Sequence, residues 1–206
     1  MLRVFLAFLM IAAALPAAAQ PLPRVKGRIV DFDGLTFHLA PEKGAPLAIR
    51  LQARTQFMTL QKRPFSALKT DAYAGATVTD AAGTLTAEEV HLYPEPMRGS
   101  SEGRIGLGDG RFVITGTVKA SAAGSVTLSY RGGAMTDGVC QGRADPSATS
   151  PACAAEAVIQ VPPEARIAAL TPANRRQLVP GAIATVTIQT DARGARSTPG
   201  LILEKP

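Results

Sequence analysis

The stretches Val25-Lys-Gly-Arg-Ile-Val30 and Gly34-Leu-Thr-Phe-His-Leu39 recur later in the chain as Ile114-Thr-Gly-Thr-Val118 and Gly124-Ser-Val-Thr-Leu128. The copies stand 89 residues apart. Apolar and polar residues alternate within them, which is typical of a β-strand with one buried face. A glycine-containing turn separates the two stretches of each copy, as a β-hairpin requires. The repetition therefore predicts an internal duplication of a β-rich unit.

The repeat continues beyond the hairpins with a larger offset of 110 residues. The matching positions are Ile49-Arg-Leu51 with Ile159-Gln-Val161, Phe57 with Ile167, and Leu60 with Leu170. The second copy therefore carries about 21 extra residues. They fall in a segment rich in glycine, alanine, serine and proline, residues 132–157, which we expect to be an inserted loop.

The chain has two cysteines, Cys140 and Cys153, and both lie in this insertion. A bridge between them closes a loop of about 14 residues, worth about 3 kcal/mol in the chain-entropy picture. A redox-active pair is the alternative, but it favours a C-x-x-C spacing or a thiol with a lowered pKa. We therefore expect a structural disulfide that keeps the inserted loop compact.

Each copy has the element order strand, strand, strand, connector, strand, strand. This is the order of the OB-fold, a small Greek-key barrel. The sequence thus predicts an all-β chain of two tandem five-stranded OB-like barrels, with no long helix after the first twenty residues. An SH3-like barrel, or a sandwich formed jointly by both copies, would fit the same strand count. The expected boundaries are residues 24–93 and 112–206, joined by a Pro/Gly-rich strap at residues 94–111.

The N-terminal residues 1–19 have the three parts of a secretory signal peptide. Arg3 supplies the positive charge, an apolar core follows, and Ala17-Ala18-Ala19 forms a small-residue cleavage site before Gln20. No later stretch is long and apolar enough to be a transmembrane helix. We expect a soluble chain exported to the periplasm and cleaved near Ala19. Its formal net charge of +6, before cleavage, serves solubility or brings the protein near anionic lipid and envelope polymers.

The phrase that runs from Glu88 through Tyr93-Pro-Glu-Pro-Met-Arg-Gly-Ser-Ser-Glu-Gly103, together with Leu178-Val-Pro-Gly-Ala182, resembles a group of uncharacterised exported bacterial proteins. These form a domain family of unknown function with an OB-like β-barrel. The resemblance covers most of the mature chain and implies the same fold and export. Such proteins are sometimes labelled as metal-transporter permeases, a label that does not fit a chain without membrane spans. The chain departs from the family at Thr70-Asp71, where Pro-Gly is usual, and in its cysteine-bearing insertion.

The strap provides the first candidate site. It mixes prolines, opposite charges and a methionine, so Arg98 and Glu102 could present charge beside Tyr93 and His91 at the rim of the first barrel. The alternative is a structural strap, with Met97 packed underneath and Arg98 paired to a nearby glutamate. If there is a binding site, we expect it at these four residues.

A metal site is the second candidate, since His38, His91 and Met97 would suit a soft metal such as copper. No local H-x-H or M-x-x-M spacing supports it, and surface histidines are the simpler interpretation. Motifs of nucleophilic catalysis are absent, so an enzyme such as a hydrolase is disfavoured. Nucleic-acid binding is disfavoured because the chain has no Trp and few outward aromatics.

Together these observations predict an exported, non-catalytic, periplasmic binding or envelope-associated module without a cofactor. Its partner would be an unknown envelope ligand or protein, and the protein would be a monomer or weak oligomer. The alternative is a periplasmic metal-binding accessory protein with His and Met ligands.

Overall fold

The computed structural model describes residues 23–145 and 147–204, and these form an all-β protein with three short 3-10 turns and no α-helix. The strands of the first half are β1 (Arg24–Phe32), β2 (Thr36–Pro41), β3 (Leu47–Lys62), β4 (Tyr73–Ala81), β5 (Thr84–Leu92) and β6 (Gly103–Gly108). Those of the second half are β7 (Arg111–Ala122), β8 (Ser125–Gly132), β9 (Ala134–Thr136), β10 (Val139–Arg143), β11 (Cys153–Gln160), β12 (Arg166–Pro172), β13 (Ile183–Thr190) and β14 (Arg196–Glu204). The 3-10 turns are η1 (Phe65–Ala67), η2 (Glu95–Met97) and η3 (Arg175–Gln177).

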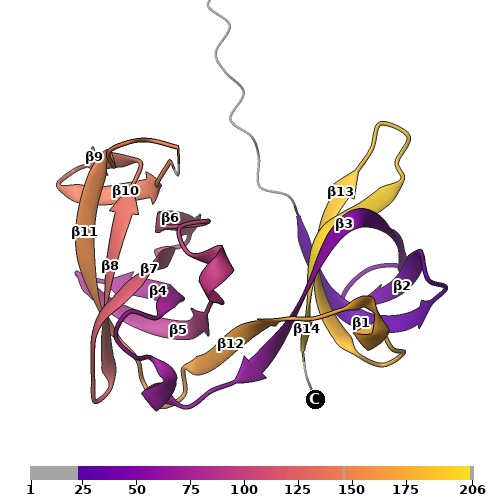
Figure 1. Ribbon diagram of the computed structural model, residues 1–206, viewed down its shortest axis with the longest axis horizontal. Coiled ribbons are helices and arrows are strands. Elements are labelled where there is room, and N and C mark those ends of the chain that lie inside the picture. The colour runs from indigo at the N-terminus through magenta and orange to yellow at the C-terminus, as the bar shows by residue number, and fades with distance from the viewer. Residues whose placement is uncertain (1–22, 146, 205–206) are drawn as a thin grey trace, which may run out of the picture.

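The first three strands close a barrel with the last two strands of the chain. β1 pairs with β2, β2 with β3, β3 in parallel with β14, β14 with β13, and β13 with β1. Because its strands come from residues 23–62 and 171–204, we call it the split barrel. It lies on the right of Figure 1.

A second ring of five strands lies entirely within residues 63–170. β4 pairs with β5, β5 in parallel with β11, β11 with β8, β8 with β7, and β7 with β4. We call it the continuous barrel; it lies on the left of Figure 1, and β3 and β12 run between the two barrels.

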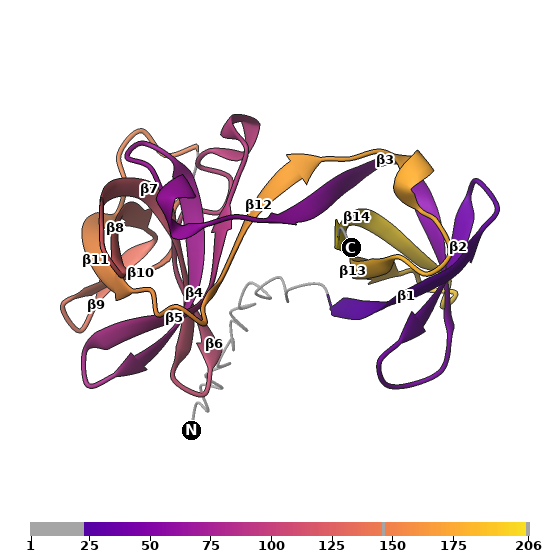
Figure 2. The ribbon, with the colours of Figure 1, turned by 90° about the horizontal axis from the view of Figure 1, so that it is seen from below.

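The expected tandem arrangement, with one barrel in residues 24–93 and another in 112–206, is therefore not what the strand pairing shows. Each copy gives its first three strands to one barrel and its last two to the other. The cause is β3, a strand of 16 residues that leaves the split barrel and runs on to the other side of the molecule (Figure 2). The strand β4 that follows therefore pairs with β7 and not with β1.

Equivalent residues of the two copies meet where β3 and β12 cross as an antiparallel ribbon. Leu60 lies opposite its equivalent Leu170, and beside this pair the hydroxyls of Thr59 and Thr171 are 2.7 Å apart. The backbone hydrogen bonds at the two ends of the ribbon are equivalent as well. Arg63 N–H donates to the Ile167 carbonyl, and Ala173 N–H donates to the Phe57 carbonyl. An approximate twofold axis that relates the two copies thus passes through this ribbon.

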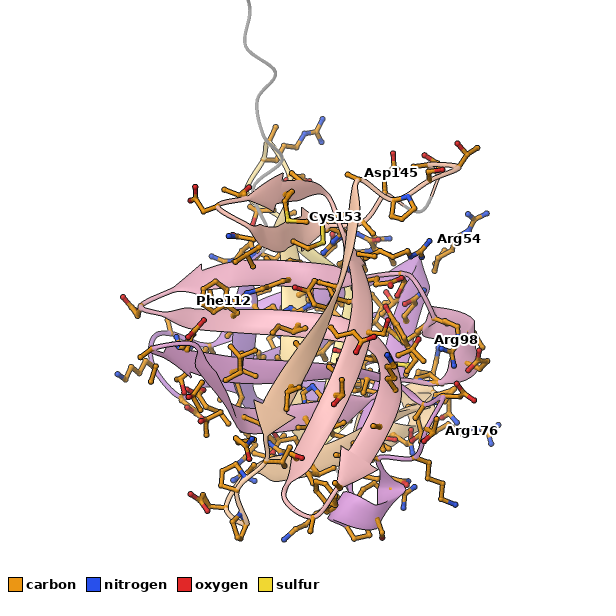
Figure 3. All side chains as sticks on the ribbon, turned by 90° about the vertical axis from the view of Figure 1, so that its left-hand side faces the viewer. Arg54, Arg98, Phe112, Asp145, Cys153 and Arg176 are labelled. Carbon is orange, nitrogen blue, oxygen red and sulfur yellow. A yellow bond between two sulfur atoms is a disulfide. The ribbon has the colours of Figure 1, made fainter. Side chains whose placement is uncertain are left out.

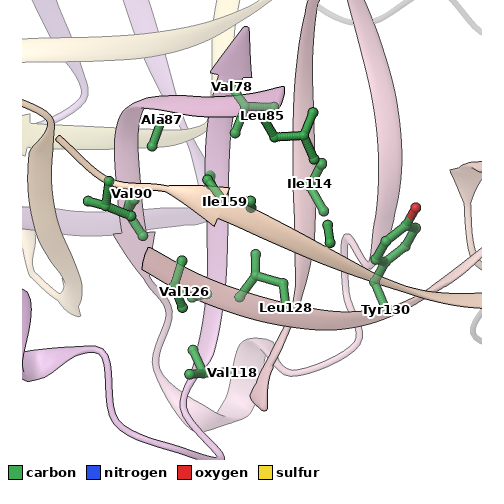
Figure 4. Close-up of a cluster of buried hydrophobic side chains, with 14 of the residues drawn as sticks. Val78, Leu85, Ala87, Val90, Ile114, Val118, Val126, Leu128, Tyr130 and Ile159 are labelled. Carbon is green, nitrogen blue, oxygen red and sulfur yellow. The ribbon is translucent and has the colours of Figure 1, made fainter. Parts of the chain in front are cut away.

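Two separate cores fill the barrels. The split barrel buries Phe37, Ile29, Leu39, Ile49 and the apolar residues of β13 and β14. The continuous barrel buries a larger set, shown in Figure 4, which includes Val78, Val90, Ile114, Val118, Val126, Leu128 and Ile159. The alternating pattern of the repeated stretches is the pattern of these inward positions.

The repeated glycine of the first strand is required by close packing. A Cβ at Gly27 would lie 2.5 Å from the Ala40 carbonyl oxygen, and a Cβ at Gly116 would lie 2.2 Å from that of Ser129. Real Cβ atoms do not approach backbone oxygen so closely, so both barrels need glycine where the first strand crosses the second.

The insertion is more ordered than the loop expected at residues 132–157. It contains the hairpin β9–β10, and β11 already begins at Cys153, before the expected third strand. The expected disulfide between Cys140 and Cys153 is present, and both cysteines are buried. The expected linker at 94–111 likewise contains η2 and the strand β6, which pairs with β7 and β10. The predicted signal peptide, residues 1–19, lies outside the described residues.

Candidate functional site

Two adjoining pockets form a cleft between the barrels, with volumes of about 150 and 250 Å³. Both are lined by Arg24, Thr185 and Ile202, so we treat them as one site, the inter-barrel cleft. The split barrel contributes β1, β13 and β14, the ribbon contributes β3 and β12, and the opposite wall is formed by β5 and η2. The cleft therefore exists only because strands of both copies are exchanged.

Apolar side chains line the part of the cleft next to the ribbon. Leu60 and Leu170 form a small buried cluster with Ala168, against which Met58, Tyr93 and Ile202 pack. Met97, on η2, lines the first pocket together with Met58 and Leu170. Methionine side chains adapt to irregular shapes, so this end of the cleft suits an apolar group.

Charged side chains line the other end and form a chain of alternating sign. Lys26 Nζ lies 2.8 Å from a Glu204 carboxylate oxygen, and Arg166 lies 3.7 Å from both Glu204 and Glu89. Glu89 in turn lies 2.7 Å from His91 Nε2. This network spans the cleft, because Lys26 and Glu204 belong to the split barrel and Glu89 and His91 to the continuous one.

Glu89 and His91 contact each other because alternate residues of a strand share a face. The hydrogen bond from His91, together with the positive charges of Arg166 and Lys26, lowers the pKa of Glu89 against the opposing effect of burial. The ionised carboxylate is thus favoured in the fold, as the network requires.

Arg24 is the exception among the charged residues of the cleft. It lines both pockets, yet within the described parts of the chain no acidic side chain lies within 4 Å of it. Tyr93 lies nearby, and burial raises the pKa of its phenol, so it stays neutral. Arg24 is therefore a cation beside an apolar floor, placed to pair with an anion.

Of the four residues predicted to form a rim site, Arg98 and Glu102 are held by the protein itself. The Arg98 guanidinium binds Glu95, the Thr117 hydroxyl and the Asp71 carbonyl, and Figure 3 shows it at the edge of the molecule. Glu102 accepts two bonds from the Arg131 guanidinium and one from its backbone N–H. These contacts are those of a structural strap.

The other two predicted residues lie closer to the cleft. His91 lines its second pocket, and its ring lies edge-on to Tyr93 with the centroids 6.5 Å apart. The ring centroids of Tyr93 and Tyr73 are 5.7 Å apart. The guanidinium carbon of Arg98 lies 5.6 Å from the centroid of the Tyr73 ring. A continuous row of side chains thus connects the strap to the cleft.

The residues of the metal alternative are distributed differently. His38 is on β2, where its Nδ1 lies 2.6 Å from Asp31, and it does not line the cleft. His91 and Met97 line adjoining pockets of the cleft. In residues 23–145 and 147–204, no group of three His, Cys, Asp or Glu side chains is arranged to hold a metal ion.

Both histidines are hydrogen-bonded to carboxylates, and among the described residues no hydroxyl or thiol is hydrogen-bonded to either ring. A nucleophile and its base must be within such reach. What the cleft does offer is an apolar surface and a cation.

Sequence reasoning missed most of the cleft, namely Arg24, Lys26, Glu89, Arg166 and Glu204. These residues come from four strands that adjoin only through the exchange, so no local spacing connects them. The spacing of Glu89 and His91 is the one local signal, since it places a carboxylate and an imidazole on one strand face.

Comparisons of the chain with protein-family models, curated proteins and solved structures found no match. The resemblance to exported OB-like proteins therefore stays an expectation. Over the described ranges, no helix has the length and apolar character needed to cross a bilayer.

Proposed function

We propose that this protein is an exported, non-catalytic binding module of the periplasm, and that the inter-barrel cleft holds a small ligand with an apolar body and one anionic group. The observation that carries the proposal is the position of Arg24, a cation without an acidic partner among the described residues, beside the apolar floor of the cleft. An arginine in this position pairs with a carboxylate, sulfonate or phosphate through two parallel hydrogen bonds.

The arrangement of the cleft supports a binding role. Ligand sites often lie between domains, with apolar walls and few polar groups that set orientation. Here the apolar end is formed by Met58, Met97 and Leu170, and the charge network at the other end is neutralised internally, apart from Arg24. A ligand anion would therefore be directed to Arg24.

The test uses 1-anilinonaphthalene-8-sulfonate, a dye with an apolar ring system and a sulfonate, and the full mature chain. We expect saturable fluorescence enhancement in the wild type. Arg24→Gln should weaken binding about ten- to a hundredfold, since hydrogen bonds to charged groups contribute about 1.5–3 kcal/mol. Met97→Ala should weaken it by a smaller factor.

Lys43→Gln is the matched control, because it removes the same charge from an exposed turn that does not line the cleft. Equal effects of Arg24→Gln and Lys43→Gln would contradict the proposed site, as would a wild-type protein that does not bind the dye. Thermal melts of each variant show whether the fold is intact.

Export is tested separately by fusing residues 1–22 to an alkaline phosphatase that is active only outside the cytoplasm. We expect phosphatase activity in whole cells. Its absence, with fusion protein present in the cytoplasm, would contradict the periplasmic location.

A further inference from the structure

The strand exchange separates charge between the barrels in a way that the sequence conceals. Counted by sequence copy, residues 24–93 contain nine Lys and Arg against seven Asp and Glu, and residues 112–206 contain nine against six. Counted by barrel, the split barrel (23–62 and 171–204) has eleven against five, and the continuous barrel (63–170) has nine against eleven. The positive charge of the protein is therefore concentrated in the split barrel.

The two barrels also differ in how their basic side chains are partnered. Six of the nine in the continuous barrel lie within 4 Å of an acidic side chain: Arg98, Arg104, Arg111, Lys119, Arg131 and Arg166. Among the described residues, Lys26 is the one basic side chain of the split barrel with such a partner. The excess charge of the split barrel is thus available to an external partner.

Four of these arginines lie at one end of the split barrel, on β3 and the β13–β14 hairpin. We call Arg50, Arg54, Arg193 and Arg196 the arginine rim; all four are exposed. Arg50 lies opposite Ser197 on β14, and Arg50 and Arg196 line a surface pocket of about 370 Å³.

The acidic residue of this pocket is committed to the backbone. Asp191 Oδ1 accepts the N–H groups of Arg193 and Ala195 and so closes the hairpin turn. No rim guanidinium lies within 4 Å of it in the described structure. Beyond the rim, Arg176 on η3 projects from the same side of the molecule as Arg54 (Figure 3). The rim therefore faces outward as an uncompensated cationic surface.

The rim also has an exposed apolar neighbour. Leu35, in the β1–β2 turn, is 61% exposed, and its carbonyl accepts the N–H of Leu51, next to Arg50. A leucine that projects beside basic residues is typical of surfaces that bind the headgroup region of a membrane. Stacking on nucleic-acid bases would need exposed aromatic rings. The three phenylalanines of the split barrel, Phe32, Phe37 and Phe57, are instead packed in or against its core.

We propose that the split barrel docks onto an anionic phospholipid bilayer through the arginine rim and Leu35. The choice of partner rests on the export that we propose above, but not on a ligand in the inter-barrel cleft. Arginine forks bind lipid phosphates, and the leucine enters the headgroup layer. The continuous barrel, whose basic residues are mostly paired, faces away from the bilayer.

The test is co-sedimentation of the mature chain with vesicles of phosphatidylcholine alone, or mixed with phosphatidylglycerol. We expect binding to the mixed vesicles only, and loss of binding at about 1 M salt, where screening is strong. The triple variant Arg50→Gln, Arg54→Gln and Arg196→Gln should lower partitioning roughly a hundredfold, given the usual contribution of each basic residue near an anionic surface. Leu35→Ser should lower it a few-fold.

The matched control is Arg63→Gln, Lys69→Gln and Arg143→Gln, which removes from the continuous barrel three basic residues that have no acidic partner within 4 Å in the described part of the chain. It should change partitioning a few-fold at most. Equal losses in both triple variants would overturn the proposal, because net charge alone would then explain binding. So would wild-type protein that binds single-stranded oligonucleotide but neither kind of vesicle.

Dye binding separates the two proposals. The rim triple variant should still bind the anilinonaphthalene dye in the cleft, and Arg24→Gln should still bind anionic vesicles. If neither wild-type activity is seen, both proposals fail independently.

Discussion

The split barrel and the continuous barrel have the same strand order but are stabilised by different means. The continuous barrel has one uninterrupted chain segment, a buried disulfide and ion pairs for six of its nine basic residues. The split barrel is made of two distant segments and has no cysteine, and among the described residues one of its eleven basic side chains has such an ion pair. The duplicated units therefore share one backbone scheme, whereas their charges differ. One barrel uses its charges internally, and the other leaves them exposed to the surroundings.

The largest expected effect tests what the barrels share. Gly116→Ala forces a methyl group against the Ser129 carbonyl and should destabilise the protein by about 3 kcal/mol or more. Gly27→Ala should have a comparable effect on the split barrel. Gly106→Ala is the control, since its nearest neighbour is 3.9 Å away. Urea unfolding of the three variants measures the difference, and equal midpoints would refute the steric explanation.

Disulfide removal tests what the barrels do not share. The variant Cys140→Ser with Cys153→Ser should lose about 3 kcal/mol of stability. Hydrogen exchange should show the loss in β8, β10 and β11, with little change in the split barrel. A uniform loss of protection over all strands would mean that the two barrels unfold as one unit.

A smaller effect concerns the network that joins the barrels. The pKa of Glu89 is lowered in the fold, so its ionised form contributes stability above its unfolded pKa, and that contribution is lost as the pH falls through the lower folded pKa. Glu89→Gln should cost about 1 kcal/mol or less at neutral pH, because the group is partly exposed. As the pH is lowered through the folded pKa of Glu89, the denaturation curves of the variant should converge with those of the wild type. A cost that persists unchanged in acid would point to packing instead.

The smallest effect concerns the turn before the fourth strand of each copy. Asp71 and Gly181 are equivalent, and both have positive φ, 68° and 89°. Glycine adopts this conformation without steric strain, so Asp71→Gly should stabilise the continuous barrel by about 0.5 kcal/mol. Arg98 binds the carbonyl of Asp71 and would keep that bond. A lower melting temperature in calorimetry would show that the Asp71 side chain has a role of its own.

Much of the fold follows from the sequence, because alternation and turns are local. The hairpins, the five-strand order and the disulfide were all predictable. The exchange was not, since a strand pattern specifies which face is buried but not which copy supplies the neighbouring strand. Leu60 and Leu170 matched in the repeat, yet nothing in that match indicates that they face each other.

The candidate site was less predictable than the fold for the same reason. Tyr93, His91 and Met97 were identified because they stand out in one short phrase. Arg24 and Glu204 lie near opposite ends of the described chain, in residues that look like ordinary strand surface. Only the pairing of β1 with β13 and of β13 with β14 brings them to one cleft.

The division of the split barrel around the continuous one has a consequence for the order of folding. When the chain is synthesised from its N-terminus, β1 to β3 are made long before β13 and β14, which complete their barrel. The continuous barrel, by contrast, can close as soon as β11 has been made. Once the continuous barrel has formed, its ends hold the two separated segments close together, which shortens the effective loop between them. We therefore expect the continuous barrel to fold first and to act as the template on which the N-terminal and C-terminal strands of the split barrel assemble.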